Sequence, residues 1–186
     1  MQETDTELVA KIRRGDKAAF AELVRRHGDS LLGMAYSLVG IMADAEDVVQ
    51  ETLMVALRRI QSFEGRSQVG TWLRGILVFK AAKLRRSRKV RTAVPIQDHD
   101  GSAEADRADS RLSSRPASIA VDSRVDVMQM LQTLSDEHRE ILVLRELQQF
   151  SYDEISAMLK VPLGTVESRL YRARQELRKR YSGYGK

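Results

Sequence analysis

The sequence predicts an all-α chain made of two small helical domains joined by a flexible linker. Apolar residues recur at helical spacing over residues 5–92 and again over residues 123–181, with no long strand-like alternation. Between them, residues 93–122 hold two of the three prolines, no aromatic residue, and six acids against three bases. We expect a linker there because such a segment cannot bury enough surface to offset the entropy of ordering it.

The composition limits the chemistry open to the chain. Hydrophobic residues make up 42% of the 186 residues, and the formal net charge of +5 favours a polyanionic partner. There is no cysteine and the three histidines lie far apart, so we expect no metal and no other cofactor. The N-terminus is polar, and no apolar run approaches the roughly 20 residues that span a bilayer. This predicts a cytoplasmic protein without membrane insertion.

In the first domain the spacing predicts about four helices, over residues 5–14, 17–40 and 44–60 and from about Thr71 onward. We expect the third helix to bury one apolar stripe, formed by Val49, Leu53, Ala56, Leu57 and Ile60. Asp47, Gln50 and Glu51 fall at i, i+3 and i+4 on a different face. They form a polar patch that faces solvent or a partner.

Acidic residues gather at the start of this third helix, namely Asp44, Glu46, Asp47 and Glu51. Clustered carboxylates can bind magnesium. Acids are also favoured at a helix N-terminus for the dipole alone, and no lysine, histidine or glycine-rich phosphate loop accompanies these. We therefore predict no metal site, and either a docking surface for a basic partner or plain solvation of the helix start.

A polar loop over residues 62–70 precedes Trp72, the single tryptophan. A lone tryptophan usually anchors a core, and we expect that role here. The loop before it could receive an unstacked base, as pockets for single-stranded nucleic acid do.

The fourth helix ends in a basic run, in which seven of the twelve residues from Lys80 to Arg91 are lysine or arginine. Like charges at helical spacing repel one another, which favours a polyanion that neutralises them. The alternative is a solvated helix end, where cations are mildly stabilising.

The second domain contains the pattern of a helix-turn-helix. Ser151 and Glu154 form a capping box that opens a short helix, and a turn over residues 160–164 leads into a longer helix that ends near Arg180. The outer face of this helix presents Thr165, Ser168, Arg169, Arg172 and Arg174. Arginine can pair with guanine or phosphate in the major groove, which predicts DNA binding. An ordinary amphipathic hairpin with a basic surface is the alternative.

Six segments together resemble extracytoplasmic-function (ECF, group IV) sigma factors of RNA polymerase. The segments are residues 44–51, 63–65, 71–73, 134–145, 151–155 and 164–174. The first three resemble region 2 of that family and the last three resemble region 4. The resemblance implies a region 2 domain at 5–92 and a region 4 domain at 123–181, without a third-region domain between them.

The resemblance also implies a function, which is to bind core RNA polymerase and direct it to promoters through the −10 and −35 elements. Asp47, Gln50 and Glu51 are then expected to bind the β′ clamp coiled coil, and the β flap is the second part of core polymerase that the chain is expected to contact. The residues expected at the −10 element are Phe63, Glu64, Gly65, Arg66, Ser67, Trp72, Phe79, Lys80, Lys83, Arg85 and Arg86. Those expected at the −35 element are Thr165, Ser168, Arg169, Arg172 and Arg174. Promoter DNA and an anti-sigma factor complete the expected partners.

Three positions depart from the family pattern. Members often carry arginine and asparagine where this chain has Gly75 and Phe79, and arginine where it has Glu167. Phenylalanine can stack on a base but cannot read its hydrogen-bonding edge. We therefore expect −10 recognition that is unusual or relies more on the loop, and a −35 sequence that cannot be transferred from relatives.

Two other classes of function compete with this interpretation. A free-standing helix-turn-helix regulator usually needs a dimerisation or effector domain, and the first domain has no evident ligand-pocket signature. An enzyme such as a nuclease needs a nucleophile or metal constellation, which the sequence does not supply. We therefore predict no enzymatic activity.

Overall fold

The computed structural model describes residues 3–93 and 127–181, and all regular structure within these ranges is helical. The prediction of an all-α chain is therefore confirmed. The expected linker lies outside the described residues from residue 94 onward, as do residues 123–126 of the expected second domain. None of the described helices is long and apolar enough to cross a membrane.

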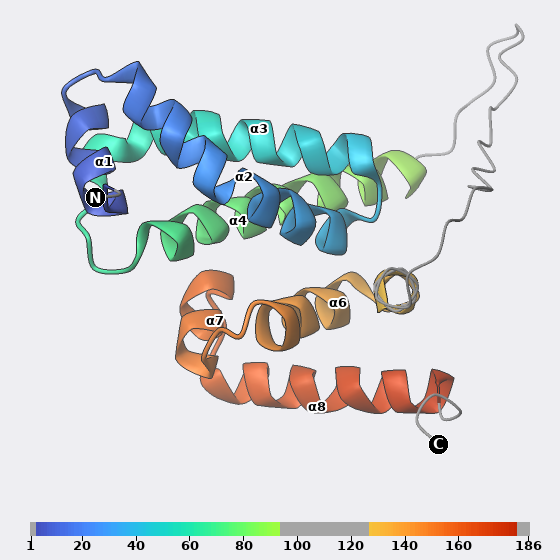
Figure 1. The fold of residues 1–186 in the computed structure, drawn as a ribbon. Helices are drawn as coiled ribbons and strands as arrows, with labels where there is room; N and C mark the ends of the chain where they lie inside the picture. Colours follow the sequence, from blue (N-terminus) through green and yellow to red (C-terminus); the bar gives the residue numbers. More distant parts are fainter. Residues whose placement is uncertain (1–2, 94–126, 182–186) are drawn as a thin grey trace, which may run out of the picture.

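The first helical bundle contains α1 (Asp5–Arg13), α2 (Lys17–Val39), α3 (Met42–Arg59), the short 3₁₀ turn η1 (Ile60–Ser62) and α4 (Val69–Ala93). Helices α2, α3 and α4 pack side by side, and α1 lies against one end of α2 (Figure 1). Two helices begin two residues earlier than predicted, since α3 starts at Met42 and α4 at Val69.

Local capping explains where the first helices begin and end. The Thr4 side chain accepts a hydrogen bond from the backbone of Glu7, whose carboxylate accepts one from the Thr4 backbone, so a capping box opens α1. Asp16 caps α2 by accepting from two backbone amides of its first turn. Gly40 ends α2 with a φ of 78°, a left-handed conformation that glycine adopts without strain.

The buried face of α3 differs from the predicted stripe. Its fully buried residues are Ala45, Val48, Thr52 and Ala56. Leu57 was expected inside but is 46% exposed, so that part of the prediction was wrong. Thr52 is tolerated in the core because its hydroxyl donates to the Val48 carbonyl at 2.7 Å.

The second bundle contains a helical segment at residues 127–132, α6 (Asp136–Leu142), the π-helical turn η2 (Val143–Leu147), α7 (Tyr152–Leu159) and α8 (Leu163–Arg180). Helix α8 packs against both α6 and α7. After η2 the backbone turns through Gln149 at a φ of 57° and places Phe150 in the core.

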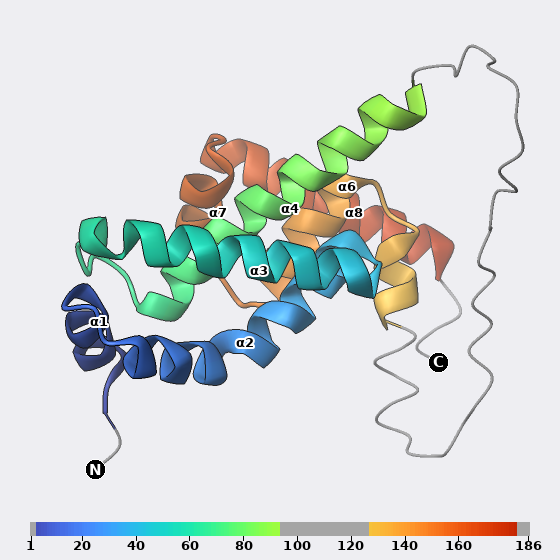
Figure 2. The ribbon, with the colours of Figure 1, turned by 90° about the horizontal axis from the view of Figure 1, so that it is seen from above.

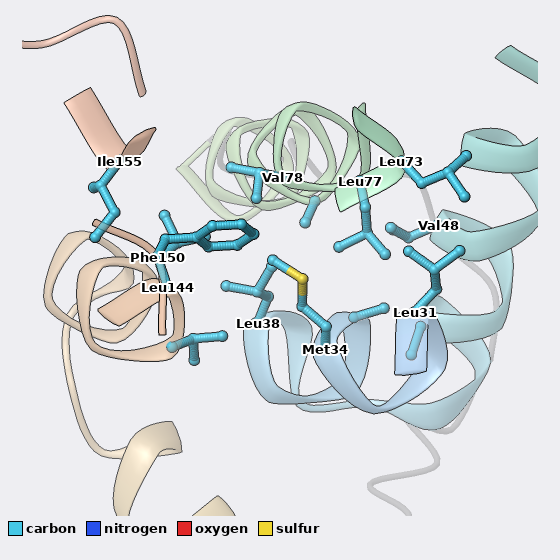
Figure 3. Packing of buried hydrophobic residues seen from close by; sticks show 14 of the residues in the cluster. Leu31, Met34, Leu38, Val48, Leu73, Leu77, Val78, Leu144, Phe150 and Ile155 are labelled. Carbon is cyan, nitrogen blue, oxygen red and sulfur yellow. The ribbon is translucent and has the colours of Figure 1, made fainter. Parts of the chain in front are cut away.

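The two bundles pack against each other as two layers (Figures 1 and 2). Helix α2 contacts α6 and η2, while α4 contacts α7. Figure 3 shows Phe150 and Leu144 of the second bundle facing Leu38 and Val78 of the first, within one continuous buried cluster. Helix α3 lies on the side of the first bundle away from the second (Figure 1).

Candidate nucleic-acid and polymerase interface

The polar patch predicted on α3 lies at the surface. Asp47, Gln50 and Glu51 are all exposed on the outer side of the first bundle. Glu51 also accepts a hydrogen bond from Lys80 Nζ of α4 at 2.7 Å, which lowers the pKa of its carboxyl. The patch therefore presents an ionised acid that is tied to the neighbouring helix.

Asp44, at the start of α3, takes no part in this patch. Its carboxylate is largely covered and forms an ion pair with Arg88 of α4. Across the described ranges, no three histidine or acidic side chains come together in an arrangement that could hold a metal ion.

The loop between η1 and α4 is built around an aromatic pair. The rings of Phe63 and Trp72 lie 4.9 Å apart between centroids, tilted by 42°. Trp72 is half-buried and packs against the core, as expected of an anchor. Gly65 permits the turn with a φ of 71°, and the loop then projects Arg66 and Ser67 into solvent.

The loop is hollowed on both of its faces. One hollow of about 660 Å³ lies between the loop and α1, with Asp5, Arg13 and His27 among its lining residues. A smaller hollow of about 300 Å³ lies on the Trp72 side. Both hollows are open to solvent, and their volumes fall within the general range of small-molecule sites.

Helix α1 holds the start of this loop through a contact that the sequence did not predict. Arg13 Nε donates to the Ile60 carbonyl at 3.1 Å, and its Nη2 donates to the Phe63 carbonyl. Gln61 returns a hydrogen bond to the Arg13 carbonyl at 2.9 Å. An arginine at a helix end gives no sequence signal for such a contact, because its acceptors are backbone carbonyls roughly fifty residues away.

The residues expected at the −10 element are brought partly together along α4. Lys83 and Arg86 are exposed, and Phe79 is 64% exposed beside the loop. Arg85 points the other way, with its side chain 9% exposed and paired to Glu140 of the second bundle. Its guanidinium is therefore turned away from solvent in this arrangement.

The predicted helix-turn-helix is present in α7 and α8. Ser151 Oγ accepts from the Glu154 amide at 3.2 Å, and the Glu154 carboxylate accepts from the Ser151 amide at 2.8 Å, which completes the capping box. Lys160 ends α7 in a left-handed conformation with a φ of 55°, and Pro162 precedes the first residue of α8.

The outer face of α8 carries the residues expected to read DNA. Ser168, Arg172 and Arg174 are exposed, whereas Thr165 and Arg169 are half-buried. Val166, Leu170 and Ala173 form the buried face. Helix α8 is therefore amphipathic, with a cationic outer side.

Two arginines of α8 are held by acids of the same bundle. Arg169 lies 3.5 Å from Glu137, and Arg174 Nη2 donates to Glu146 at 2.7 Å. The Glu146 hydrogen bond raises the pKa of Arg174. These contacts hold both guanidinium groups in place beside the outer face.

The comparisons with known proteins agree with this geometry. The family model of sigma-70 region 2 matches residues 23–91, and that of sigma-70 region 4 matches residues 124–177. The RNA polymerase sigma-H factor of Pseudomonas aeruginosa is 33% identical over 181 residues, covering 96% of this chain and 94% of that one. The ECF RNA polymerase sigma-E factor of Escherichia coli K12 is 34% identical over 182 residues, covering 95% and 93%.

A solved structure has the same fold. The sigma factor RpoE, solved in complex with the anti-sigma factor NepR from Bartonella quintana, aligns with a TM-score of 0.62 and 29% identity. The alignment covers 89% of this chain and 98% of that one. The two family models, the nearly full-length relatives and the shared fold show that the chain belongs to the extracytoplasmic-function sigma factors, the RNA polymerase subunits that direct transcription initiation to promoters.

Proposed function

We propose that the chain binds core RNA polymerase through α3, reads the −10 element with the loop and α4, and reads the −35 element with α8. The observation that carries this proposal is the presence of three separate exposed surfaces of matching chemistry on one chain. The chain supplies recognition and no chemistry of its own, and it acts in the cytoplasm without a cofactor. The domain limits that we propose, 5–92 and 123–181, enclose both matched segments.

The docking surface comprises Asp47, Gln50 and Glu51, which bind the β′ clamp coiled coil. Their exposure on the outer side of the first bundle supports this role, because the second bundle does not cover them. The second bundle in turn meets the β flap.

The −10 surface combines the loop with the cationic face of α4. The exposed ring of Phe79 offers a base a stacking platform, and Lys83 and Arg86 offer contacts to phosphate. The hollows beside Phe63 can receive an unstacked base.

The −35 surface is the outer face of α8. Ser168 is exposed in the N-terminal half of the helix, the part that a helix-turn-helix inserts into the major groove, and Arg172 is exposed near the middle of the helix. Glu167 lies on the same exposed side, where it repels phosphate or accepts a hydrogen bond from a cytosine amine.

An anti-sigma factor is the further partner that we propose. The sigma factor RpoE, solved with the anti-sigma factor NepR, shares this fold over nearly its whole length. A protein partner of the same kind is thus expected to control the present chain.

Co-elution with core RNA polymerase tests the docking assignment. We expect the wild-type chain to elute with core at equal stoichiometry and the Asp47→Ala, Gln50→Ala double variant to elute mostly free. Asp29→Ala is the matched control, since it removes an exposed acid from α2 of the same bundle. Binding that survives the double substitution places the interface elsewhere. A wild-type chain that fails to bind core and instead binds duplex DNA as a dimer supports the regulator alternative.

A further inference from the structure

The surface between the two bundles contains an ion pair that is almost fully buried. Arg85 Nη2 of α4 lies 2.5 Å from Glu140 Oε1 of α6, and the two side chains are 9% and 11% exposed. The two residues lie on opposite sides of the segment that the sequence predicts to be a linker. Separating the two charges while both stay buried would leave each without its counter-charge, which costs free energy. The pair therefore specifies how the two bundles meet.

The same pair is incompletely compensated, which lowers the cost of releasing Arg85 into water. Among the described residues, no hydrogen-bond partner reaches the buried Arg85 Nη1. A buried donor without a partner carries a desolvation cost. Moving Arg85 to solvent or to a phosphate removes that cost. The ion pair therefore defines how the bundles pack but adds little to the stability of the packed arrangement.

Polar contacts from the second bundle also grip the end of α2. Arg139 Nη1 donates to the Leu38 carbonyl at 3.1 Å, and Arg139 Nε donates to the Leu131 carbonyl of its own bundle at 2.9 Å. A cation at the C-terminus of α2 is favoured by the helix dipole. The amide of Gln132 lies over Gly40, where a Cβ atom would overlap it.

Apolar side chains complete this interface. The Phe150 ring projects toward Leu38 and Val78 across the boundary between the bundles (Figure 3). Phe150 and both partners are buried. Gln149, the residue before Phe150, has a left-handed backbone conformation that is uncommon outside glycine. The packing of Phe150 holds the backbone in this conformation.

We infer that the ends of α2 and α4 form an interaction surface whose occupant in the free protein is the second bundle of the same chain, with the Arg85–Glu140 pair as its latch. In this closed arrangement Arg85 is held by a carboxylate instead of a promoter phosphate. The α3 patch stays exposed, so core polymerase can dock before the latch opens. The inference rests on the proposed function, because closure matters only if both bundles must reach DNA together.

The length of the promoter requires the latch to open. The −10 and −35 elements are named for positions about 25 base pairs apart, which is roughly 85 Å at 3.4 Å per base pair. A compact chain of this length has a radius of gyration of about 16 Å and hence a diameter of roughly 40 Å. The packed bundles therefore cannot contact both elements at once, and the latch keeps the free chain from occupying a promoter.

Energy transfer between two dyes measures the closure directly. The chain has no cysteine, so Asp29→Cys on α2 and Lys179→Cys on α8 provide two exposed labelling positions, one in each bundle. We expect high transfer in the free chain and a clear fall with Glu140→Ala, which leaves Arg85 buried without its counter-charge. Glu137→Ala is the matched control, because Glu137 lies on the same helix but pairs with Arg169 of its own bundle.

A charge swap separates opening from unfolding. Arg85→Glu and Glu140→Arg should each lower the transfer, and the double variant should restore it, while the helical circular dichroism stays unchanged in all three. Transfer that Glu140→Ala leaves at the wild-type level overturns the latch, as does a double variant that stays open.

Binding to core polymerase tests whether closure lowers the affinity of the chain for core. If closed chains outnumber open ones about ten to one, Glu140→Ala should tighten the apparent affinity for core about tenfold, because only the open fraction completes the assembly. An opened chain whose affinity is unchanged overturns the inhibitory role. A wild-type chain that does not bind core at all contradicts the proposed function, while the dye measurement still decides on the latch.

Discussion

Phe79 presents a ring that is 64% exposed beside the loop. Such a ring can stack on any base and has no group that reads a base edge. We expect Phe79→Asn to change the base preference at the −10 element while core binding stays unchanged. The measurement is transcription by the reconstituted holoenzyme from promoters that vary at single −10 positions.

Phe79→Leu is the control for this prediction, since it keeps apolar volume but removes the aromatic face. Phe79→Leu should weaken transcription from all of these promoters without changing their order of strength. An unchanged −10 preference in Phe79→Asn would show that the loop alone selects the base.

Glu22 gives a prediction for the dependence of stability on pH. Hydrogen bonds from Arg25 and then Arg26 lower the pKa of its carboxyl to about 2. The unfolded chain titrates this group near its ordinary value of about 4.3, so the stabilising contribution is present above that pH and is lost as the pH falls toward 2. Solvent screening keeps the contribution small.

Glu22→Gln should therefore unfold at a lower temperature than wild type at pH 6, and the difference should shrink between about pH 4.3 and pH 2. Thermal melts across this window, followed by circular dichroism, measure it. A difference that does not vary with pH would mean that the two arginines contribute nothing through the ionised carboxylate.

At the scale of single residues, the sequence pattern predicted which side chains are exposed better than it predicted which residues they contact. The exposure of Asp47, Gln50 and Arg172 followed from helical periodicity. Periodicity failed for Leu57, because the buried face of α3 includes Thr52, whose hydroxyl bonds within the helix, and is therefore rotated away from the predicted apolar stripe. It also failed to predict the burial of Arg85, since the acid that compensates its charge lies in the other bundle.

Helix α1 lies outside the segment matched by the region 2 family model, yet it positions the loop. We expect Arg13→Ala to weaken holoenzyme binding to forked DNA with an unpaired −10 strand by roughly fivefold, the equivalent of about one hydrogen bond. The reason is that the carbonyls of Ile60 and Phe63 lose their donor, so the loop is held less firmly.

Arg14→Ala serves as the matched control, because it removes the adjacent exposed cation at the end of the same helix. Core binding should be unchanged in both variants. Equal losses in Arg13→Ala and Arg14→Ala would assign the effect to charge and remove the positioning role from α1.

At the scale of elements, local signals decided what could be predicted. The capping box of Ser151 and the position of Pro162 defined α7 and α8 correctly, because both signals act within a few residues. The π-helical turn η2 and the left-handed Gln149 were not predicted. Both features place Phe150 in the core, and they depend on tertiary packing. No local sequence pattern predicts either of them.

The continuous core predicts that the two bundles unfold together. Trp72 is the single tryptophan and is packed into the first bundle, so its emission reports mainly on that bundle, whereas circular dichroism reports on both. In wild type the two signals should follow one urea transition. Phe150→Ala should lower the stability of the second bundle by about 3–5 kcal/mol and separate the two transitions.

Separate transitions in the wild-type chain would contradict this expectation and show that the interface stabilises the packed bundles too little to couple their unfolding. Leu163→Ala is a suitable control, because Leu163 is an exposed leucine of the second bundle. Its two signals should still coincide.

At the scale of the whole molecule, the sequence predicted the two domains and their order but not their contact. Each bundle is specified by its own apolar spacing, which the chain carries locally. The interface depends on contacts such as Arg139 with the Leu38 carbonyl, between residues about a hundred positions apart. Periodicity does not indicate which surfaces of two helical bundles meet.

We expect this chain to convert core RNA polymerase into a promoter-specific enzyme. The most direct measurement is to map the 5′ ends of transcripts made in vitro from genomic DNA of the source organism, by core alone and by core with the chain. The chain should add a new set of start sites, each preceded by two shared elements at a constant separation, and the Asp47→Ala, Gln50→Ala double variant should abolish them. A set of start sites that is the same with and without the chain would show that it does not direct core polymerase to promoters.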